Sequence, residues 1–198
     1  MEIFKYLMFS LMVLLTVGCD SDNGTTPTGF TAQELTEQGW EKFGTVDYEK
    51  ALEKFQEAIE IDANYIEAYC AAGWAKARLT NLANAVSYFS NCISLNSSYV
   101  DGLAGIAFVY NAQKNYQSAI TSATNALNKS STWAFLHDET LNYKDLHLLL
   151  AECYFALLNF SDSLTQVKIL NSSFTADIST YDGMAALAAE IERLMGIV

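Results

Sequence analysis

Apolar side chains recur three and four residues apart along most of the chain after residue 30, which is the spacing of one face of an α-helix. The helical stretches are short, and polar turns separate them at 44–47, 80–81 and 114–115. The chain has one proline, Pro27, and it precedes this region. A capping box, Thr31–Glu34, marks the start of the first helix. The pattern therefore predicts an all-α fold of short, paired helices from about residue 31.

The helical pattern repeats at an interval of 34 residues. The dipeptide Gly-Trp occurs at Gly39 and again at Gly73, and Ala107 takes the same place in the next unit. Three further columns align at this interval: Ala51, Ala85 and Ala119; Ala58, Cys92 and Ala126; and Phe55, Phe89 and the departure Ala123. Small residues at fixed places let two helices cross closely. The period predicts a stack of helical hairpins.

These columns resemble the tetratricopeptide repeat (TPR), although the closing proline of that family is absent. The register gives repeats at 32–65, 66–99 and 100–133, and a fourth at 144–177. The fourth is displaced by ten residues, because Ala107 and Ala151 are 44 positions apart, and this defines an insertion at 130–143. Residues 178–196 predict a capping helix over the last repeat. The resemblance implies a right-handed α-α superhelix, a TPR solenoid.

The first nineteen residues resemble a bacterial lipoprotein signal. Lys5 precedes an apolar run of twelve residues, 6–17, which is shorter than the roughly 20 that cross a bilayer as a helix. Gly18 then stands before Cys19. This resemblance predicts a signal peptide at 1–18, lipidation of Cys19, a flexible tether at 19–30 and a TPR domain at 31–198. An ordinary secretory signal and an uncleaved anchor are the alternatives.

The charge balance limits the kind of partner. The chain has 23 acidic and 11 basic side chains, a formal net charge of -12, and no run of basic residues. Binding to a phosphate backbone needs a basic patch, so no nucleic-acid partner is expected. Glu67, Asp101, Asp145 and Glu152 fall at positions that line the groove of a TPR solenoid. They favour a partner segment of apolar and basic character.

Catalytic motifs are missing from the sequence. The two histidines, His137 and His147, have no second ligand at metal-binding spacing, and no phosphate loop, dinucleotide motif or nucleophile elbow occurs. Cys70, Cys92 and Cys153 each lie in an apolar helical pattern. They are expected to be buried thiols, with one disulfide as the alternative. We therefore expect no enzyme, no metal and no cofactor.

The TPR resemblance implies that the first helix of each repeat lines a concave groove. An aromatic ladder is expected along it, and aromatic residues are common anchors of peptide interfaces. The predicted partner-binding residues are Trp40, Phe43, Trp74, Arg78, Phe108, Asn111, Glu152 and Phe155. Alternatively, these rings pack on neighbouring helices. The insertion, through Trp133, Phe135 and Leu136, could also fold over the groove as a lid or as a permanent plug, and a permanent plug would leave no site.

Together these features predict a scaffold or adaptor of the bacterial cell envelope. It would be anchored in a membrane through Cys19, would face the periplasm or the cell surface, and would bind a protein or peptide in the groove. Two other classes stay open. One is a glycan- or small-ligand-binding lipoprotein that stacks sugars on Trp40, Trp74 and Phe108. The other is a structural or self-associating spacer.

Overall fold

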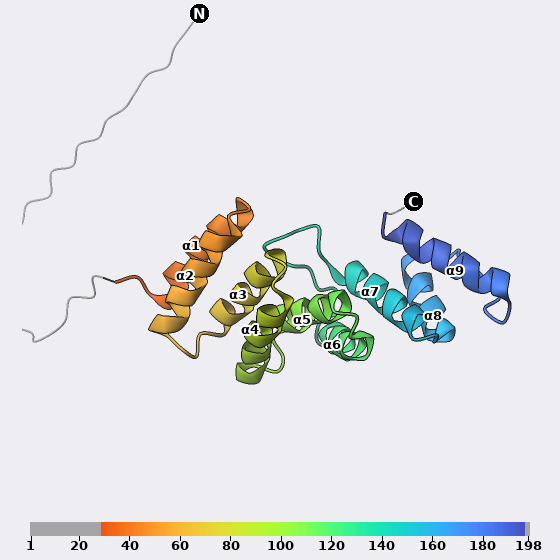
Figure 1. The fold of residues 1–198 in the computed structure, drawn as a ribbon, viewed down its shortest axis with the longest axis horizontal. Coiled ribbons are helices and arrows are strands. Elements are labelled where there is room, and N and C mark those ends of the chain that lie inside the picture. Colours follow the sequence, from red (N-terminus) through yellow and green to blue (C-terminus); the bar gives the residue numbers. More distant parts are fainter. Residues whose placement is uncertain (1–28, 197–198) are drawn as a thin grey trace, which may run out of the picture.

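The computed structural model describes residues 29–196, so the predicted signal peptide, Cys19 and most of the predicted tether lie outside the described residues. Within this range the chain forms nine α-helices. They are α1 (Ala32–Gly44), α2 (Tyr48–Ile61), α3 (Ile66–Arg78), α4 (Leu82–Leu95), α5 (Val100–Ala112), α6 (Tyr116–Lys129), α7 (Tyr143–Ala156), α8 (Phe160–Leu170) and α9 (Tyr181–Leu194). Figure 1 shows them following one another in chain order, from α1 at one end to α9 at the other. The predicted all-α superhelical repeat fold is confirmed.

The helices pair into hairpins through one recurring three-residue turn. Its second residue has a positive φ in each hairpin: Val46, Thr80, Lys114 and Leu158. Its third residue caps the next helix, because its side-chain oxygen accepts a backbone N–H: Asp47, Asn81, Asn115 and Asn159. The capping box at the start of α1 is confirmed, since the Thr31 hydroxyl accepts the Glu34 N–H at 3.1 Å and the Glu34 carboxylate accepts the Thr31 N–H at 2.8 Å.

The aligned small residues lie where helices cross. Those of the second helices are fully buried: Ala51, Ala58, Ala85, Cys92, Ala119 and Ala126. The glycine of each Gly-Trp pair lies against the aromatic ring of its own hairpin. A Cβ added to Gly73 would be 2.7 Å from the Phe89 ring, and one added to Gly39 would be 2.3 Å from the Phe55 ring. Glycine therefore stands at these two positions because the ring of the second helix occupies the space of a side chain.

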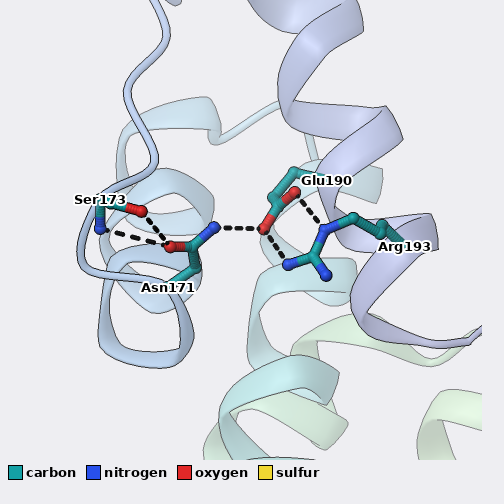
Figure 2. A network of polar contacts seen from close by, with 4 residues as sticks. All are labelled: Asn171, Ser173, Glu190 and Arg193. Atoms are coloured by element: carbon teal, nitrogen blue, oxygen red, sulfur yellow. Dashed lines mark hydrogen bonds and ion pairs between the residues drawn. The ribbon is translucent and has the colours of Figure 1, made fainter.

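Helix α9 closes the C-terminal end of the stack. Its Leu187 and Ile191 pack against Ala151 and Val167 of the fourth hairpin. On its polar edge the Glu190 carboxylate accepts hydrogen bonds from Arg193 and, at 2.8 Å, from the Asn171 amide at the end of α8 (Figure 2). These donors, Arg193 foremost, lower the pKa of Glu190 to about 2. The network fixes α9 on α8, as expected for a cap that covers an apolar face.

None of the helices in residues 29–196 is both long enough and apolar enough to cross a membrane.

Candidate functional site

Trp40 of α1, Trp74 of α3 and Phe108 of α5 stand on the same face of the solenoid, here called the concave face. They share one position in successive repeats, and the rings of Trp74 and Phe108 are 6.3 Å apart between centroids. Trp40 and Phe108 are half-buried, whereas Trp74 is only 4% exposed. The ladder is therefore present but is not open along its length.

The insertion covers this ladder, and in the structure it spans residues 130–142, because α7 already begins at Tyr143. Figure 1 shows it leaving the row of helices and reaching back past α5 towards α3. Phe135, which is 1% exposed, stacks on Trp74 with a centroid distance of 4.4 Å and meets Trp40 edge-on at 5.9 Å. Trp133 is also buried, at 4% exposed. Two aromatic side chains of the insertion therefore join the central core of the domain.

Polar residues of the insertion make contacts around this apolar centre. The His137 imidazole stacks on the Trp40 indole at 3.6 Å and 5°, and burial there lowers the pKa of His137. Arg78, at the end of α3, forms an ion pair with Asp138. Leu136 points outward and is 81% exposed. Of the three apolar insertion residues singled out in the sequence, Phe135 covers the ladder, Trp133 is buried beside Phe135, and Leu136 does neither.

The three indole N–H groups have different environments. Trp40 donates to the Glu67 carboxylate at 3.1 Å, and Trp133 donates to the Asp101 carboxylate at 2.6 Å. The Trp74 N–H is buried and has no hydrogen-bond partner. Burial raises the pKa of Asp101, and the hydrogen bond from Trp133 opposes that rise. A buried N–H without an acceptor is unfavourable, so the Trp74 indole is the unsatisfied point of this site.

An apolar cavity of about 280 Å³ remains beside the insertion. Trp74, Phe108 and Ala112 line it from α3 and α5, Leu141 lines it from the insertion, and Arg78 stands at its wall. Ala112 is exposed, so the cavity is accessible from solvent. Three predicted groove residues, Trp74, Arg78 and Phe108, therefore border an open space while the insertion is in place.

A second cavity, of about 300 Å³, lies between α7 and α9. Glu152 and Phe155, both predicted groove residues, line it together with Ile191 and Met195. The Glu152 carboxylate also accepts a hydrogen bond from the Asn111 amide at 2.8 Å, which links α7 to α5. Five of the eight predicted groove residues therefore line one of two separate cavities, and Trp40, Phe43 and Asn111 line neither.

Two predicted groove residues are core residues in the structure. Phe43 is 4% exposed because its ring packs edge-on against Trp40 and Tyr48, at 5.2 and 5.0 Å. Trp74 is covered by Phe135, as described above. Phe43 therefore lies in the core and not on an open groove, whereas Trp74 is covered by Phe135 and reaches open space only at the wall of the first cavity.

The acidic residues expected to make the groove negative have internal partners. Glu67 and Asp101 accept indole N–H groups, Glu152 accepts Asn111, and Asp145 completes the capping box of α7 by accepting the Asn142 N–H at 2.8 Å. Asp138 of the insertion meets Arg78, the one basic side chain predicted for the groove. The sequence register identified these positions, but it did not reveal that the chain itself would satisfy them.

The described residues hold no group of three metal-binding side chains. Cys70, Cys92 and Cys153 are free and buried, which confirms the expectation of buried thiols. Burial raises the pKa of Cys153 to about 12, and its thiol donates to the Asn111 side chain at 3.2 Å. A thiol with so high a pKa is protonated at neutral pH and is a poor nucleophile.

Comparison with known proteins agrees with the repeat register. Residues 66–99, the second predicted repeat, match the tetratricopeptide repeat family model. The fold is similar to the first TPR of Spaghetti (RPAP3) bound to the HSP90 peptide SRMEEVD, with a TM-score of 0.56 and 19% identity over 64% of this chain and 93% of that one. It is also similar to MamA, with a TM-score of 0.60 and 13% identity over 83% and 81% of the two chains.

The TPR2B domain of yeast Sti1, solved in a complex with pHsp70, has a TM-score of 0.54 and 21% identity over 62% of this chain and 94% of that one. No curated protein sequence matches the chain. Identities this low show the fold alone. The chain therefore shares the helical-repeat fold of these TPR structures, two of which were solved with a peptide or protein partner.

Proposed function

We propose that this protein is a non-catalytic scaffold that binds a polypeptide segment on its concave face. One observation carries the proposal: the concave face already holds a stretch of polypeptide, the chain's own insertion, through aromatic side chains. Phe135 lies against Trp74 and Trp40, as a partner's anchor residue would. The similarity to TPR domains described with bound peptides supports the same kind of ligand.

The cavity beside the insertion offers a docking point for a partner in the covered structure. Its wall is apolar, and Arg78 adds a cation beside it. One apolar side chain fully buried there would contribute roughly 1.5–3 kcal/mol. The entropy of ordering a segment offsets part of this gain, so a short segment would bind at about micromolar affinity or more weakly.

We place the scaffold at the bacterial cell envelope, anchored through Cys19. The proposal rests on the apolar run at 6–17 and the Gly18–Cys19 junction, which resemble a lipoprotein signal. The protein should incorporate a radiolabelled fatty acid in cells, and a Cys19→Ala variant should not. Failure of the unchanged protein to take up the label would instead favour an ordinary secretory signal or an uncleaved anchor.

Photo-crosslinking in living cells tests partner binding. A photoreactive residue at Ala112 points at the open cavity, and one at Ala83 serves as a matched control, because Ala83 is also an exposed helical alanine but lies on the outer helix α4. A discrete protein adduct from position 112 alone would support the scaffold. Equal adducts from both positions, or none from either, would count against it.

A structural spacer is the second candidate, and the burial of Phe135 in the central core favours it. A spacer would give no adduct from Ala112, and a self-associating one would change its apparent size with concentration. A glycan platform on Trp40, Trp74 and Phe108 has less support. Stacking on it would require the insertion to leave, because Phe135 and His137 already cover the two indoles.

A further inference from the structure

The unpaired Trp74 indole is best understood by comparing successive repeats. Trp40 donates to Glu67, which follows it by 27 residues. In the next repeat Asp101 follows Trp74 by the same 27 residues, and so stands at the position from which it would accept the Trp74 N–H. In the structure that carboxylate accepts the Trp133 N–H instead. The insertion has taken the acceptor that the repeat provides for Trp74.

The insertion is a self-contained unit in its backbone hydrogen bonds. The Phe135 N–H donates to the Leu141 carbonyl at 2.9 Å, and the Tyr143 N–H donates to the Trp133 carbonyl at 2.7 Å. The remaining backbone bonds of residues 133–141 join them to one another or to Ser130 at the base of the insertion. No backbone hydrogen bond ties this segment to α1, α3 or α5 of the described structure. Its release from the concave face would therefore break no backbone hydrogen bond to α1, α3 or α5.

Side chains alone hold the insertion on the concave face. They are the rings of Trp133, Phe135 and His137, the indole bond to Asp101 and the ion pair between Asp138 and Arg78. A partner segment that presents the same groups can replace every one of these contacts. When the insertion leaves, Asp101 also becomes available to the Trp74 N–H, which restores the pairing seen at Trp40.

We propose, resting on the function proposed above, that the insertion is a displaceable internal occupant and that the partner imitates it. The partner segment carries two aromatic side chains separated by one residue, an N–H donor on the first, and a carboxylate three residues after the second. This revises the expectation of a basic partner. The groove carboxylates Glu67 and Asp101 accept indole N–H groups, and Arg78 pairs with a carboxylate, that of Asp138. The partner segment should therefore be aromatic and acidic. A partner must compete with a tethered segment, whose effective concentration is on the order of millimolar.

A peptide with the sequence of residues 131–141, labelled with fluorescein, tests this proposal on the purified protein. The variant with Trp133→Ala and Phe135→Ala removes the two internal anchors, and Leu136→Ala is the matched control because Leu136 is 81% exposed on the same segment. We expect the double variant to bind the peptide at least tenfold more tightly than the wild type and Leu136→Ala do. A control peptide with alanine at both aromatic positions should not bind.

A folded double variant that binds the peptide no better than the wild type would overturn the proposal. If the double variant loses its helical circular dichroism, amide hydrogen exchange of the wild type decides instead. A released segment with so few backbone bonds is marginally stable by itself. The Phe135 and Tyr143 amides should then exchange at least tenfold faster than core amides of α3 and α5 such as Ala71 and Ala104, both of which are fully buried. Exchange of all four at one rate would show a permanent plug.

These results separate this inference from the proposed function. An adduct from Ala112 in cells, with no peptide binding by a folded double variant, would keep the scaffold and reject the imitation. No adduct from Ala112, with tight peptide binding by the double variant, would show a groove that accepts this chemistry but has no partner in those cells.

Discussion

Replacing Trp133 by phenylalanine removes one indole N–H and keeps an aromatic ring against the core. Two effects follow at Asp101, whose carboxylate accepts that N–H at 2.6 Å in the structure. If no other group donates to Asp101, loss of this hydrogen bond to a charged group lowers the free energy of unfolding by about 1.5–3 kcal/mol. If the unpaired Trp74 N–H donates to Asp101 instead, most of this loss is recovered, and only the effect of the smaller ring remains.

A double-mutant cycle isolates this exchange. Trp133→Phe is compared in the wild type and in a Trp74→Phe background, where no second donor exists. The volume effects cancel in the cycle, so we expect Trp133→Phe to cost about 1–2 kcal/mol more in the Trp74→Phe background. The free energies of unfolding come from denaturant titrations at neutral pH. Costs that add to within about 0.5 kcal/mol would refute the idea that Trp74 and Trp133 compete for Asp101.

The pH dependence of the cycle gives an internal control. Burial raises the pKa of Asp101, and the Trp133 bond opposes that rise, so removing both donors raises the pKa further. A carboxyl with a raised pKa in the folded state destabilises the protein as the pH rises through that pKa, since the charged form is buried without a donor. The extra cost in the double variant should therefore shrink at acidic pH. A cost that is constant with pH would assign it to packing.

Three further predictions concern the repeats and the insertion. Gly73→Ala should lower the free energy of unfolding by about 1–2 kcal/mol, because a Cβ at 2.7 Å from the Phe89 ring overpacks the core. Gly44→Ala is the control and should be neutral or stabilising, because a Cβ there would meet nothing within 4 Å. Equal effects of the two substitutions would contradict this. Val46→Gly should stabilise the protein by about 0.5–1 kcal/mol in denaturant titrations, because φ is 65° at this exposed turn; a loss of stability would refute left-handed strain there. Burial lowers the pKa of His137 below 6.5, so an imidazole released from the concave face binds a proton more readily than the buried one. Packing of the insertion on the concave face should therefore weaken as the pH falls below 6.5. Amide exchange of the insertion, corrected for intrinsic rates, should show more opening at pH 5.5 than at 7.5, and His137→Phe should abolish this difference.

The helices could be predicted because their information is local and repeated. The 34-residue columns and the Thr31 cap depend on neighbours along the chain and on contacts that recur in every hairpin. The sequence predicts a close crossing of two helices at Gly73, and the structure confirms it, since a Cβ there would lie 2.7 Å from the Phe89 ring. The same periodicity also predicts that Trp40, Trp74 and Phe108 share one face.

The state of the concave face could not be predicted in the same way. The insertion has no periodic pattern, so its length and its aromatic residues indicated a lid or a plug without choosing between them. The acceptor of Trp133 depends on where α5 lies in space, 32 residues earlier in the chain. Phe43 shows the same limit, because its burial depends on the Tyr48 and Trp40 rings and not on its register position.

The insertion also changes how the repeats depend on one another. In a plain solenoid each repeat contacts only its neighbours, so terminal repeats can unfold while the rest of the stack stays intact. Here one segment from beyond the third hairpin touches Trp40 in α1, Trp74 in α3 and Asp101 in α5. Loss of order in any of these hairpins therefore removes contacts from the other two. The first three repeats should melt as a single cooperative unit while the segment is in place, and a partner that displaces it would return them to stepwise, end-first unfolding.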